Sequence, residues 1–438
     1  MVIVGGGCPS FDDMFRVVGG EPVVLAEGVE GVLVKARSVL VSEASRRPVY
    51  GYCTGLGALY DSRGFCGPGW ERSVLLEHAV GVGPEAPAGL VRLFMFIRLS
   101  QMVLGFDPVR PVVALRIVEA LNANITPRVP LRGSLGASGD LVPAAHAFLC
   151  IYYGEGSAYK NGMAMSCGEA LRSGGLEPLP LESGEALALI NSTAWSTALL
   201  AYSIAKLERL IGYSLAKARE TLEVCRCNPE HYIGDIAGVK RHPGIALALE
   251  KLGSPACGGP VRLQDPYSLR CIPYIYAPVI ELVELSKSIV EREACSPSTN
   301  PLILGDKVVH SCAFYASHIA MAADALAIAA AHIANSIERR IAQIMRGEIT
   351  GLPEFLAKEA PAGAMILHYV ASAITARIRL LANPASTHTT PVSHLQEDVT
   401  PQAAEAALKL MEIADLLEEL VNLEAKVLET ARTIRERD

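Results

Sequence analysis

Residues 402–435 read QAAEAALKLMEIADLLEELVNLEAKVLETARTIR and predict a long amphipathic helix. Leucine or isoleucine recurs at spacings of three and four, with glutamate and lysine between, at positions 410, 413, 417 and 420. Apolar residues at this spacing form one stripe along a helix, and that stripe is stable only when it packs against a neighbouring element. The stretch therefore predicts a helix that runs along a bundle.

Helical patterns continue through most of the chain. Residues 313–346 are rich in alanine and largely apolar, which predicts a helix that is buried on most of its sides. Further helices are expected at 29–45, 86–104, 112–122, 185–226 and 275–293, with short strands or loops at 125–132 and 301–312. We predict a mainly α protein, a long antiparallel helical bundle with a small, loop-rich N-terminal α+β part. Glycines and prolines near 175–184 suggest two domains, 1–180 and 181–438.

Composition excludes several classes of protein. Half of the 438 residues are apolar and the net charge is −7, so the chain lacks the basic surface of a nucleic-acid-binding protein. The N-terminus has no signal-peptide pattern, and the most apolar stretch, 319–333, is interrupted by Asp324, so we expect no membrane span. Eleven scattered cysteines predict reduced thiols in a cytoplasmic protein. Cys225, Cys227 and His231 lack a second ligand pair, so we expect no metal site.

The tripeptide Ala137-Ser138-Gly139 lies within Gly133-Ser-Leu-Gly-Ala-Ser-Gly-Asp140. Its flanking glycines permit sharp bends, and Gly139 has an unhindered amide nitrogen. Attack of that nitrogen on the Ala137 carbonyl carbon would close a five-membered ring with loss of water. A second dehydration, at Ser138, would leave an exocyclic methylene, an electrophile that no ordinary side chain supplies. The alternative is a surface loop before a helix that begins near Asp140.

Single polar residues elsewhere allow two interpretations each. Tyr50 lies beside a glycine-rich loop and could act as a general base if a cation or electrophile lowered its pKa, or it could be half-buried and inert. His78 near the end of a predicted helix could bind a ligand or cap that helix. Asn191 in the middle of an apolar predicted helix could serve a site or bond to another helix. Arg270 could bind a carboxylate or pair with Asp265.

Taken together, these stretches resemble the aromatic amino acid ammonia-lyases that carry a methylidene-imidazolone (MIO) prosthetic group, and within them the histidine-acting enzymes most. The motifs run in order over nearly the whole chain, and Ala-Ser-Gly-Asp and Gln-Asp-Pro-Tyr-Ser-Leu-Arg are the most specific. They are Tyr50-Gly with Thr54-Gly-Leu-Gly57, His78-Ala-Val-Gly-Val-Gly83, Gly133 to His146, Glu185 to Thr193, Gln264 to Cys271, Thr299-Asn-Pro301, Met321 to Asp324 and Gln396-Glu-Asp398.

The resemblance implies a role for each of these residues. Ala137, Ser138 and Gly139 would cyclise to MIO with help from Asp140, and no external cofactor would be needed. Tyr50 would remove the β-proton of an amino acid substrate. The remaining site residues would surround the prosthetic group or the substrate: Asn191, Gln264, Tyr267, Arg270 on the substrate carboxylate, and Phe314. The family also implies a fumarase/aspartase-like fold and a homotetramer whose active sites draw residues from several subunits.

Two positions bear on the substrate. Histidine-acting members tend to carry a histidine where His78 stands and a glutamate where Glu397 stands, whereas phenylalanine-acting members carry apolar residues and glutamine. A carboxylate can hydrogen-bond an imidazole ring or favour its protonated form, but it would be costly unpaired against a phenyl ring. Both residues favour L-histidine, with trans-urocanate and ammonia as products. The carboxylates of Gln396-Glu-Asp398 could instead favour the N-terminus of the last helix.

The chain departs from the family's usual residues, and it ends about forty residues after Glu397, short of the usual C-terminal segment. These departures leave open a tyrosine or phenylalanine ammonia-lyase or a 2,3-aminomutase, and more remotely a catalytically silent helical scaffold. The substituted positions are Cys53 and Leu56 in the motif after Tyr50, Leu395 before Gln396, and Ala313 and Tyr315 beside Phe314.

Overall fold

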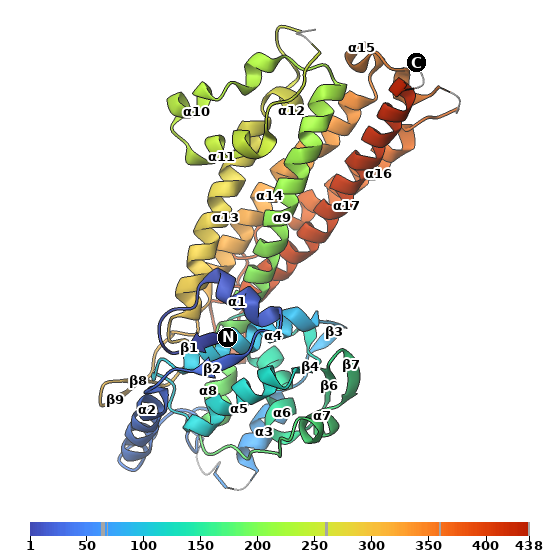
Figure 1. Ribbon diagram of the computed structural model, residues 1–438. Helices are drawn as coiled ribbons and strands as arrows, with labels where there is room; N and C mark the ends of the chain where they lie inside the picture. The colour runs from blue at the N-terminus through green and yellow to red at the C-terminus, as the bar shows by residue number, and fades with distance from the viewer. Residues whose placement is uncertain (63–65, 68, 259–261, 359–360, 437–438) are drawn as a thin grey trace. The chain divides into compact units, whose positions relative to one another are not determined.

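A computed structural model describes residues 1–62, 66–67, 69–258, 262–358 and 361–436 (Figure 1). The chain forms two compact units that are discontinuous in sequence. Unit 1 comprises residues 1–202, 287–321 and 385–408, and unit 2 comprises 203–286, 322–384 and 409–438. Four long helices have residues in both units, whereas the sequence predicts a single boundary near residue 180. The division into two domains, 1–180 and 181–438, stays a prediction.

Unit 1 packs short helices around α4, which is buried from Leu90 to Met102. Its helices are α1 (Phe11–Val18), α2 (Val29–Ala44), α3 (Trp70–His78), α4 (Ala88–Met102), α5 (Pro111–Asn122), α6 (Leu141–Tyr153), α7 (Cys167–Ser173) and α8 (Glu185–Ile190). Its described strands form small sheets: β1 (Val2–Val4) with β2 (Val23–Leu25), β3 (Val82–Glu85) with β5 (Pro130–Arg132), β6 (Ser157–Lys160) between β4 (Ile125–Pro127) and β7 (Met163–Ser166), and β8 (Leu302–Leu304) with β9 (Lys307–Val309).

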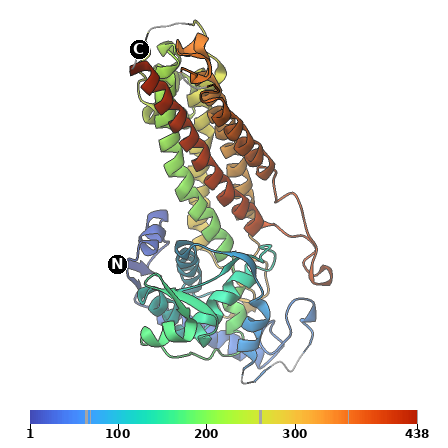
Figure 2. The same cartoon turned by 90° about the vertical axis from the view of Figure 1, so that its right-hand side faces the viewer.

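Unit 2 is built on long helices that lie side by side, as both views show (Figures 1 and 2). The long helices are α9 (Ala194–Val224), α13 (Ile272–Ala294), α14 (Ser317–Ile344), α16 (Met365–Leu381) and α17 (Ala403–Glu436). Shorter helices join them: α10 (Asp235–Lys240), α11 (Pro243–Leu252), α12 (Tyr267–Arg270) and α15 (Gly347–Thr350). Within the bundle, the buried Arg340 on α14 donates to Glu424 on α17 at 2.6 Å.

The predicted helical stripe is confirmed, because Leu410, Ile413, Leu417 and Leu420 are all fully buried on α17. The mainly α fold is confirmed as well. The predicted helix 185–226 is wrong in one respect, since it is interrupted between Ile190 and Ala194. Glu185–Val224 and α14 are long and apolar enough to cross a membrane, but 94% and 67% of their most apolar windows are buried inside the structure. Burial of that kind is what core helices show.

The expectation of reduced thiols is wrong for eight of the eleven cysteines. The fold brings distant cysteines to Cα separations of 4.8–5.3 Å, which suits a disulfide, and sequence spacing cannot show such proximity. Cys225, Cys271 and Cys312 are free. The four bonds are Cys8–Cys295, Cys53–Cys66, Cys150–Cys167 and Cys227–Cys257.

Candidate active site

The tripeptide occupies a sharp bend whose backbone is tightly confined. Gly139 has a φ of +74°, and a Cβ at this position would lie 2.5 Å from the Ser192 nitrogen and 2.7 Å from its carbonyl oxygen. Ala137 is buried, at 8% exposure. Only glycine meets both the positive φ and the close approach, so the backbone that carries the Gly139 nitrogen is fixed against Ser192.

Asp140 anchors the C-terminal end of this bend, directly before α6. Its carboxylate accepts hydrogen bonds from the hydroxyls of Ser134 and Ser196, each at 2.7 Å, and from the Ser196 amide at 2.7 Å. Its own backbone N–H donates to the Ser192 carbonyl at 2.7 Å. Burial raises the pKa of Asp140, and these hydrogen bonds act in the opposite direction. Asp140 thereby ties the bend to the first turn of α9.

Asn191 does not lie in the middle of a helix, as the sequence predicts, but in the interruption between α8 and α9. The break frees its side chain, whose amide nitrogen donates to the Ser138 carbonyl. Its Oδ1 is buried and has no partner in the described part of the chain. A buried amide oxygen without a donor is costly unless a ligand supplies one, which favours a binding role over a helix–helix bond.

The short helix α8 that presents Asn191 is held at both ends. Glu71 on α3 accepts from the N–H groups of Gly184 and Ala186, at 3.0 and 2.7 Å, at its N-terminus. At its C-terminus, the buried Arg98 on α4 donates to the carbonyls of Ala188 and Leu189. Unpaired groups at both helix ends are thereby satisfied by charged side chains, which fixes where α8 stops. Burial is the main cause that raises the pKa of Glu71 to about 7.

Tyr50 lies in the glycine-rich segment after α2 and lines the candidate site together with Ser138. Its hydroxyl oxygen accepts from the Gly57 N–H at 2.9 Å, and its backbone N–H donates to Nε2 of His310 at 3.2 Å. A role for Tyr50 as general base would be favoured by a lowered pKa, and this chain alone does not provide that. Burial, with the negative charge of Glu397, raises the pKa of Tyr50 despite the Gly57 hydrogen bond.

Glu397 contacts the tripeptide directly. Ser138 Oγ donates to Glu397 Oε1 at 2.8 Å, while Oε2 is buried without a partner in the described part of the chain. The segment before it forms a turn in which Val392 pairs with Glu397 and Ser393 Oγ accepts from the Ala58 N–H at 3.0 Å. Glu397 therefore faces Ser138 and is six residues before the start of α17, so it does not cap that helix.

Two adjoining cavities meet at Ser138, with volumes of about 540 and 730 Å³. Sizes in this range are typical of small-molecule sites. Both cavities are lined by Tyr50, Gly57, Ala137, Ser138 and Glu397. The first adds Leu56, Leu59, Trp70, Val74, Glu77, His78, Leu141, Leu187 and Asn191, and the second adds Asn300, His310, Phe314, Tyr315, Gln396 and Asp398.

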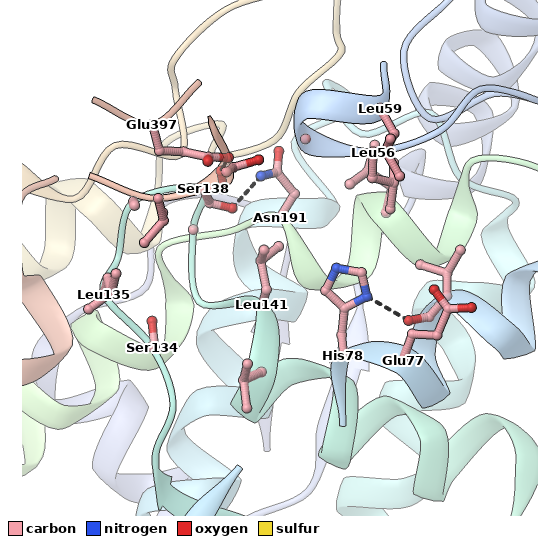
Figure 3. Close-up of a pocket in the computed structure, with 18 of the residues that line it drawn as sticks. Leu56, Leu59, Glu77, His78, Ser134, Leu135, Ser138, Leu141, Asn191 and Glu397 are labelled. Carbon is pink, nitrogen blue, oxygen red and sulfur yellow. Dashed lines mark hydrogen bonds between the residues drawn. The ribbon is translucent and has the colours of Figure 1, made fainter. Parts of the chain in front are cut away.

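His78 ends α3 and lines the first cavity. Figure 3 shows its ring across Leu141 from Ser138, Asn191 and Glu397. Its Nδ1 lies 2.7 Å from the Val74 carbonyl oxygen, which can only accept. Nδ1 therefore carries the proton, and Nε2 of the neutral ring is a hydrogen-bond acceptor. A helix residue thus holds the ring in one tautomer.

Known proteins share this combination of fold and motifs. The profile of the aromatic amino acid lyase family matches residues 10–438. A probable histidine ammonia-lyase of Thermoplasma volcanium is 33% identical over 437 residues, covering 97% of this chain and 88% of the relative. The chain belongs to the aromatic amino acid lyase family. It is an enzyme of the carbon–nitrogen lyase class.

Solved structures of similar proteins have the same fold as this lyase. Histidine ammonia-lyase from Trypanosoma cruzi superposes with a TM-score of 0.86 at 26% identity, covering 99% of this chain and 84% of that one. The ergothioneine-degrading enzyme ergothionase from Treponema denticola gives 0.93 at 24% identity, covering 99% and 90%. The second likeness, at that identity, establishes the fold only.

Three predicted site residues of the lyase belong to unit 2, whereas every described residue that lines the two cavities belongs to unit 1. Gln264 and Tyr267 are exposed, and the Arg270 guanidinium lies 4.9 Å from the Tyr267 ring centroid. Arg270 is not the ion-pair partner of Asp265, which pairs with Arg262 at 2.6 Å. The structure of one chain thus leaves Arg270 available for another partner.

Three of the five residues that differ from the family's usual motifs form a disulfide or line a cavity of the lyase. Cys53 is bonded to Cys66, Leu56 lines the first cavity, and Tyr315 lines the second beside Phe314. Leu395 is 68% exposed in a turn of positive φ and lines neither cavity. The departures thus change the walls of the cavities more than the groups around Ser138.

Reasoning from the sequence missed three charged residues near the lyase site. Glu71 and Arg98 bond to backbone groups at the ends of α8, and such contacts leave no motif in a sequence. Glu77 lines the first cavity beside His78. Its position directly before a suspected ligand-binding histidine was a signal that could have pointed to it.

Proposed function

We propose that this lyase is a histidine ammonia-lyase that eliminates ammonia from L-histidine and yields trans-urocanate. The contact between Glu397 and Ser138, beside a cavity that also contains His78, is the observation that carries this proposal. A protonated imidazole ring offers N–H donors to both side chains, whereas a phenyl ring would leave the buried Glu397 oxygen unpaired. The relatives named histidine ammonia-lyase support the same substrate.

The residues around the bend fit an MIO group formed from Ala137, Ser138 and Gly139. The confined Gly139 and the anchored Asp140 would keep the bend in place during ring closure, and Asn191 would hold the ring by the Ser138 carbonyl. When present, the group supplies an electrophile that turns the substrate's amine into a better leaving group. No external cofactor is proposed.

Within the site, we assign proton removal to Tyr50. Tyr50 lines both cavities, and its ionised phenolate form would accept the β-proton of the substrate at Oη. That proton is weakly acidic, so positioning and electrostatics must lower a large barrier. Phe314 would pack against the substrate from the wall of the second cavity.

We further propose a homotetramer in which Gln264, Tyr267 and Arg270 of neighbouring subunits complete each site, with Arg270 on the substrate carboxylate. The exposure of Leu263, at 83%, and of Tyr267, at 71%, supports an interface at this segment. A monomeric elution profile would count against this arrangement. We place the enzyme in the cytoplasm, where disulfides such as the four among the described residues occur in proteins of heat-adapted organisms.

Intact mass and a substrate panel test the proposal together. The wild-type chain should fall short of its encoded mass by two waters, and Ser138→Ala should restore that mass and abolish turnover. L-histidine should then be the substrate whose elimination product appears. Full encoded mass in the wild type would favour a silent scaffold. Dehydrated protein that releases ammonia from tyrosine or phenylalanine and ignores histidine would refute the substrate, and a β-amino acid product would indicate an aminomutase.

A further inference from the structure

The first cavity contains a second carboxylate, Glu77, that neither the motifs nor the elimination chemistry uses. Glu77 is the penultimate residue of α3, and it lines the cavity together with His78, the last. Figure 3 shows it beyond His78 as viewed from Ser138, at the end of the cavity away from the tripeptide. Its side chain is exposed, and no hydrogen bond or ion pair joins it to the described part of the chain. The carboxylate is therefore available to a ligand.

The charged side chains of the first cavity are carboxylates. Among its described lining residues there are two carboxylates, Glu77 and Glu397, and no lysine or arginine. Glutamates are ordinarily ionised at neutral pH, so the cavity favours a positively charged occupant. The elements that pack against α3 add no charge to this wall, since α6 contributes Leu141 and Val142 and α8 contributes Leu187. His78 and Tyr50 are the other titratable groups among the described lining residues.

Three side chains of the cavity present hydrogen-bond acceptors. With the proton on Nδ1, the neutral form of His78 offers a lone pair at Nε2, and Glu397 Oε2 is buried without a donor in the described part of the chain. With Glu77, the wall that receives the ring presents three acceptors. A phenyl ring has no donor and a phenol has one, whereas a protonated imidazole has two N–H donors and a positive charge. This wall is complementary to an imidazolium ring.

We propose that Glu77 is a specificity-determining residue that binds the distal N–H of a cationic imidazole ring and selects it over uncharged aryl rings. This inference rests on the proposed function, because it assigns the ring of the same substrate to the first cavity. Glu397 binds near the reacting centre and Glu77 at the far end, so the two carboxylates bracket the ring. Glu77 touches only the ring, so it should affect binding more than the chemical step.

Calorimetric binding of imidazolepropionate and phenylpropionate to the full-length wild type and Glu77→Gln tests this without turnover. A charge-assisted hydrogen bond lost from the ring should weaken imidazolepropionate binding about tenfold, whereas phenylpropionate binding should change less than about twofold. In turnover of L-histidine, KM should rise about tenfold while kcat changes less than about twofold. Glu30→Gln, an exposed change of equal charge on α2, is the matched control and should leave both affinities unchanged.

The results separate this inference from the proposed function. An intact mass short by two waters and an unchanged melting temperature would show that Glu77→Gln folds and matures. Equal affinities in the wild type and Glu77→Gln, or equal losses for both propionates, would overturn the role of Glu77. A dehydrated wild type that binds imidazolepropionate through Glu77 but does not turn over L-histidine would refute the proposed function alone.

Discussion

Two segments meet at the candidate active site, and they are held in opposite ways. The bend 133–140, which carries Ser138, is fixed by residues more than fifty positions away, since Asn191, Ser192 and Ser196 all bond to it. The segment 50–62, which carries Tyr50, is held mainly by its own residues. Leu59 and Tyr60 in this segment are 64% and 49% exposed.

The difference matches the chemistry proposed for each segment. Ring closure within a peptide requires the reacting nitrogen and carbonyl carbon to be held close together, so the backbone of the bend must be confined from outside. A base and a hydrophobic wall that receive a substrate benefit from a segment that can adjust. We therefore expect changes in the bend to abolish maturation, and changes in the segment 50–62 to alter turnover while maturation continues.

Gly139→Ala should have the largest effect. An added Cβ would lie 2.5 Å from the Ser192 nitrogen at a φ of +74°, so the bend must move and the ring should not close. Intact mass should then equal the encoded mass, with no turnover. Gly175→Ala is the matched control, because Gly175 has a φ of +73° and a Cβ there meets no atom within 4 Å. Folded Gly139→Ala protein that has lost two waters would show that the bend is not confined as described.

Tyr50→Phe should leave maturation intact and reduce kcat by roughly 10²- to 10⁴-fold, the usual contribution of a general base. Intact mass should still be short by two waters. Tyr52→Phe changes a half-buried tyrosine outside both main cavities and should leave kcat within about twofold. Failure of Tyr50→Phe to mature would instead show that this tyrosine supports the bend.

The pH dependence of kcat/KM tests the role of Tyr50. Burial and Glu397 raise the pKa of Tyr50, so its ionised fraction is small at neutral pH and grows as pH increases. If no other group intervenes, kcat/KM should rise with pH through neutrality into the alkaline range, and Tyr50→Phe should remove that rise. A plateau near neutral pH would indicate that a cation from a neighbouring subunit lowers the pKa.

Sequence reasoning predicted the fold well, because helix periodicity is local. The stripe from Leu410 to Leu420 is visible in three spacings and is buried as expected. The interruption at Asn191 was missed, since apolar helical sequence continues on both sides of Asn191-Ser192-Thr193 and no glycine or proline stands at the break. What stops α8 is Arg98, nearly a hundred residues away, bonded to its last carbonyls. Tertiary contacts of that kind override local propensity.

For the candidate site, motif order brought together residues that the structure also groups, namely Tyr50, His78, Ser138, Asn191 and Glu397. It could not foresee the disulfides, because pairing depends on distances in the folded chain. It also could not foresee the direction of the pKa shift at Tyr50, which depends on burial and on the neighbouring Glu397. Gln264, Tyr267 and Arg270 stay predictions, since the lining of the cavities comes from unit 1 alone.

Breaking the bond between Cys53 and Cys66 should have the smallest effect. It tests whether the segment 50–62 can adjust to the substrate. The disulfide closes the loop that presents Leu56 and Leu59 to the first cavity, across a separation of 13 residues. Cys66→Ser should release that loop, raise KM for the substrate several-fold and leave maturation complete by intact mass. Closing a loop of this size stabilises a fold by about 3 kcal/mol in the chain-entropy description, so the melting temperature should fall.

Cys167→Ser is the matched control, because it breaks the bond to Cys150 across 17 residues and neither cysteine lines a cavity. It should lower the melting temperature by a similar amount without changing KM. A reducing agent applied to the wild type should reproduce the KM of Cys66→Ser. If both variants raised KM equally, general loss of stability would explain the effect, and the segment 50–62 would have no special adaptability. If Cys66→Ser instead prevented dehydration of Ser138, the bend would depend on this segment after all, and the two could not be treated as separately held.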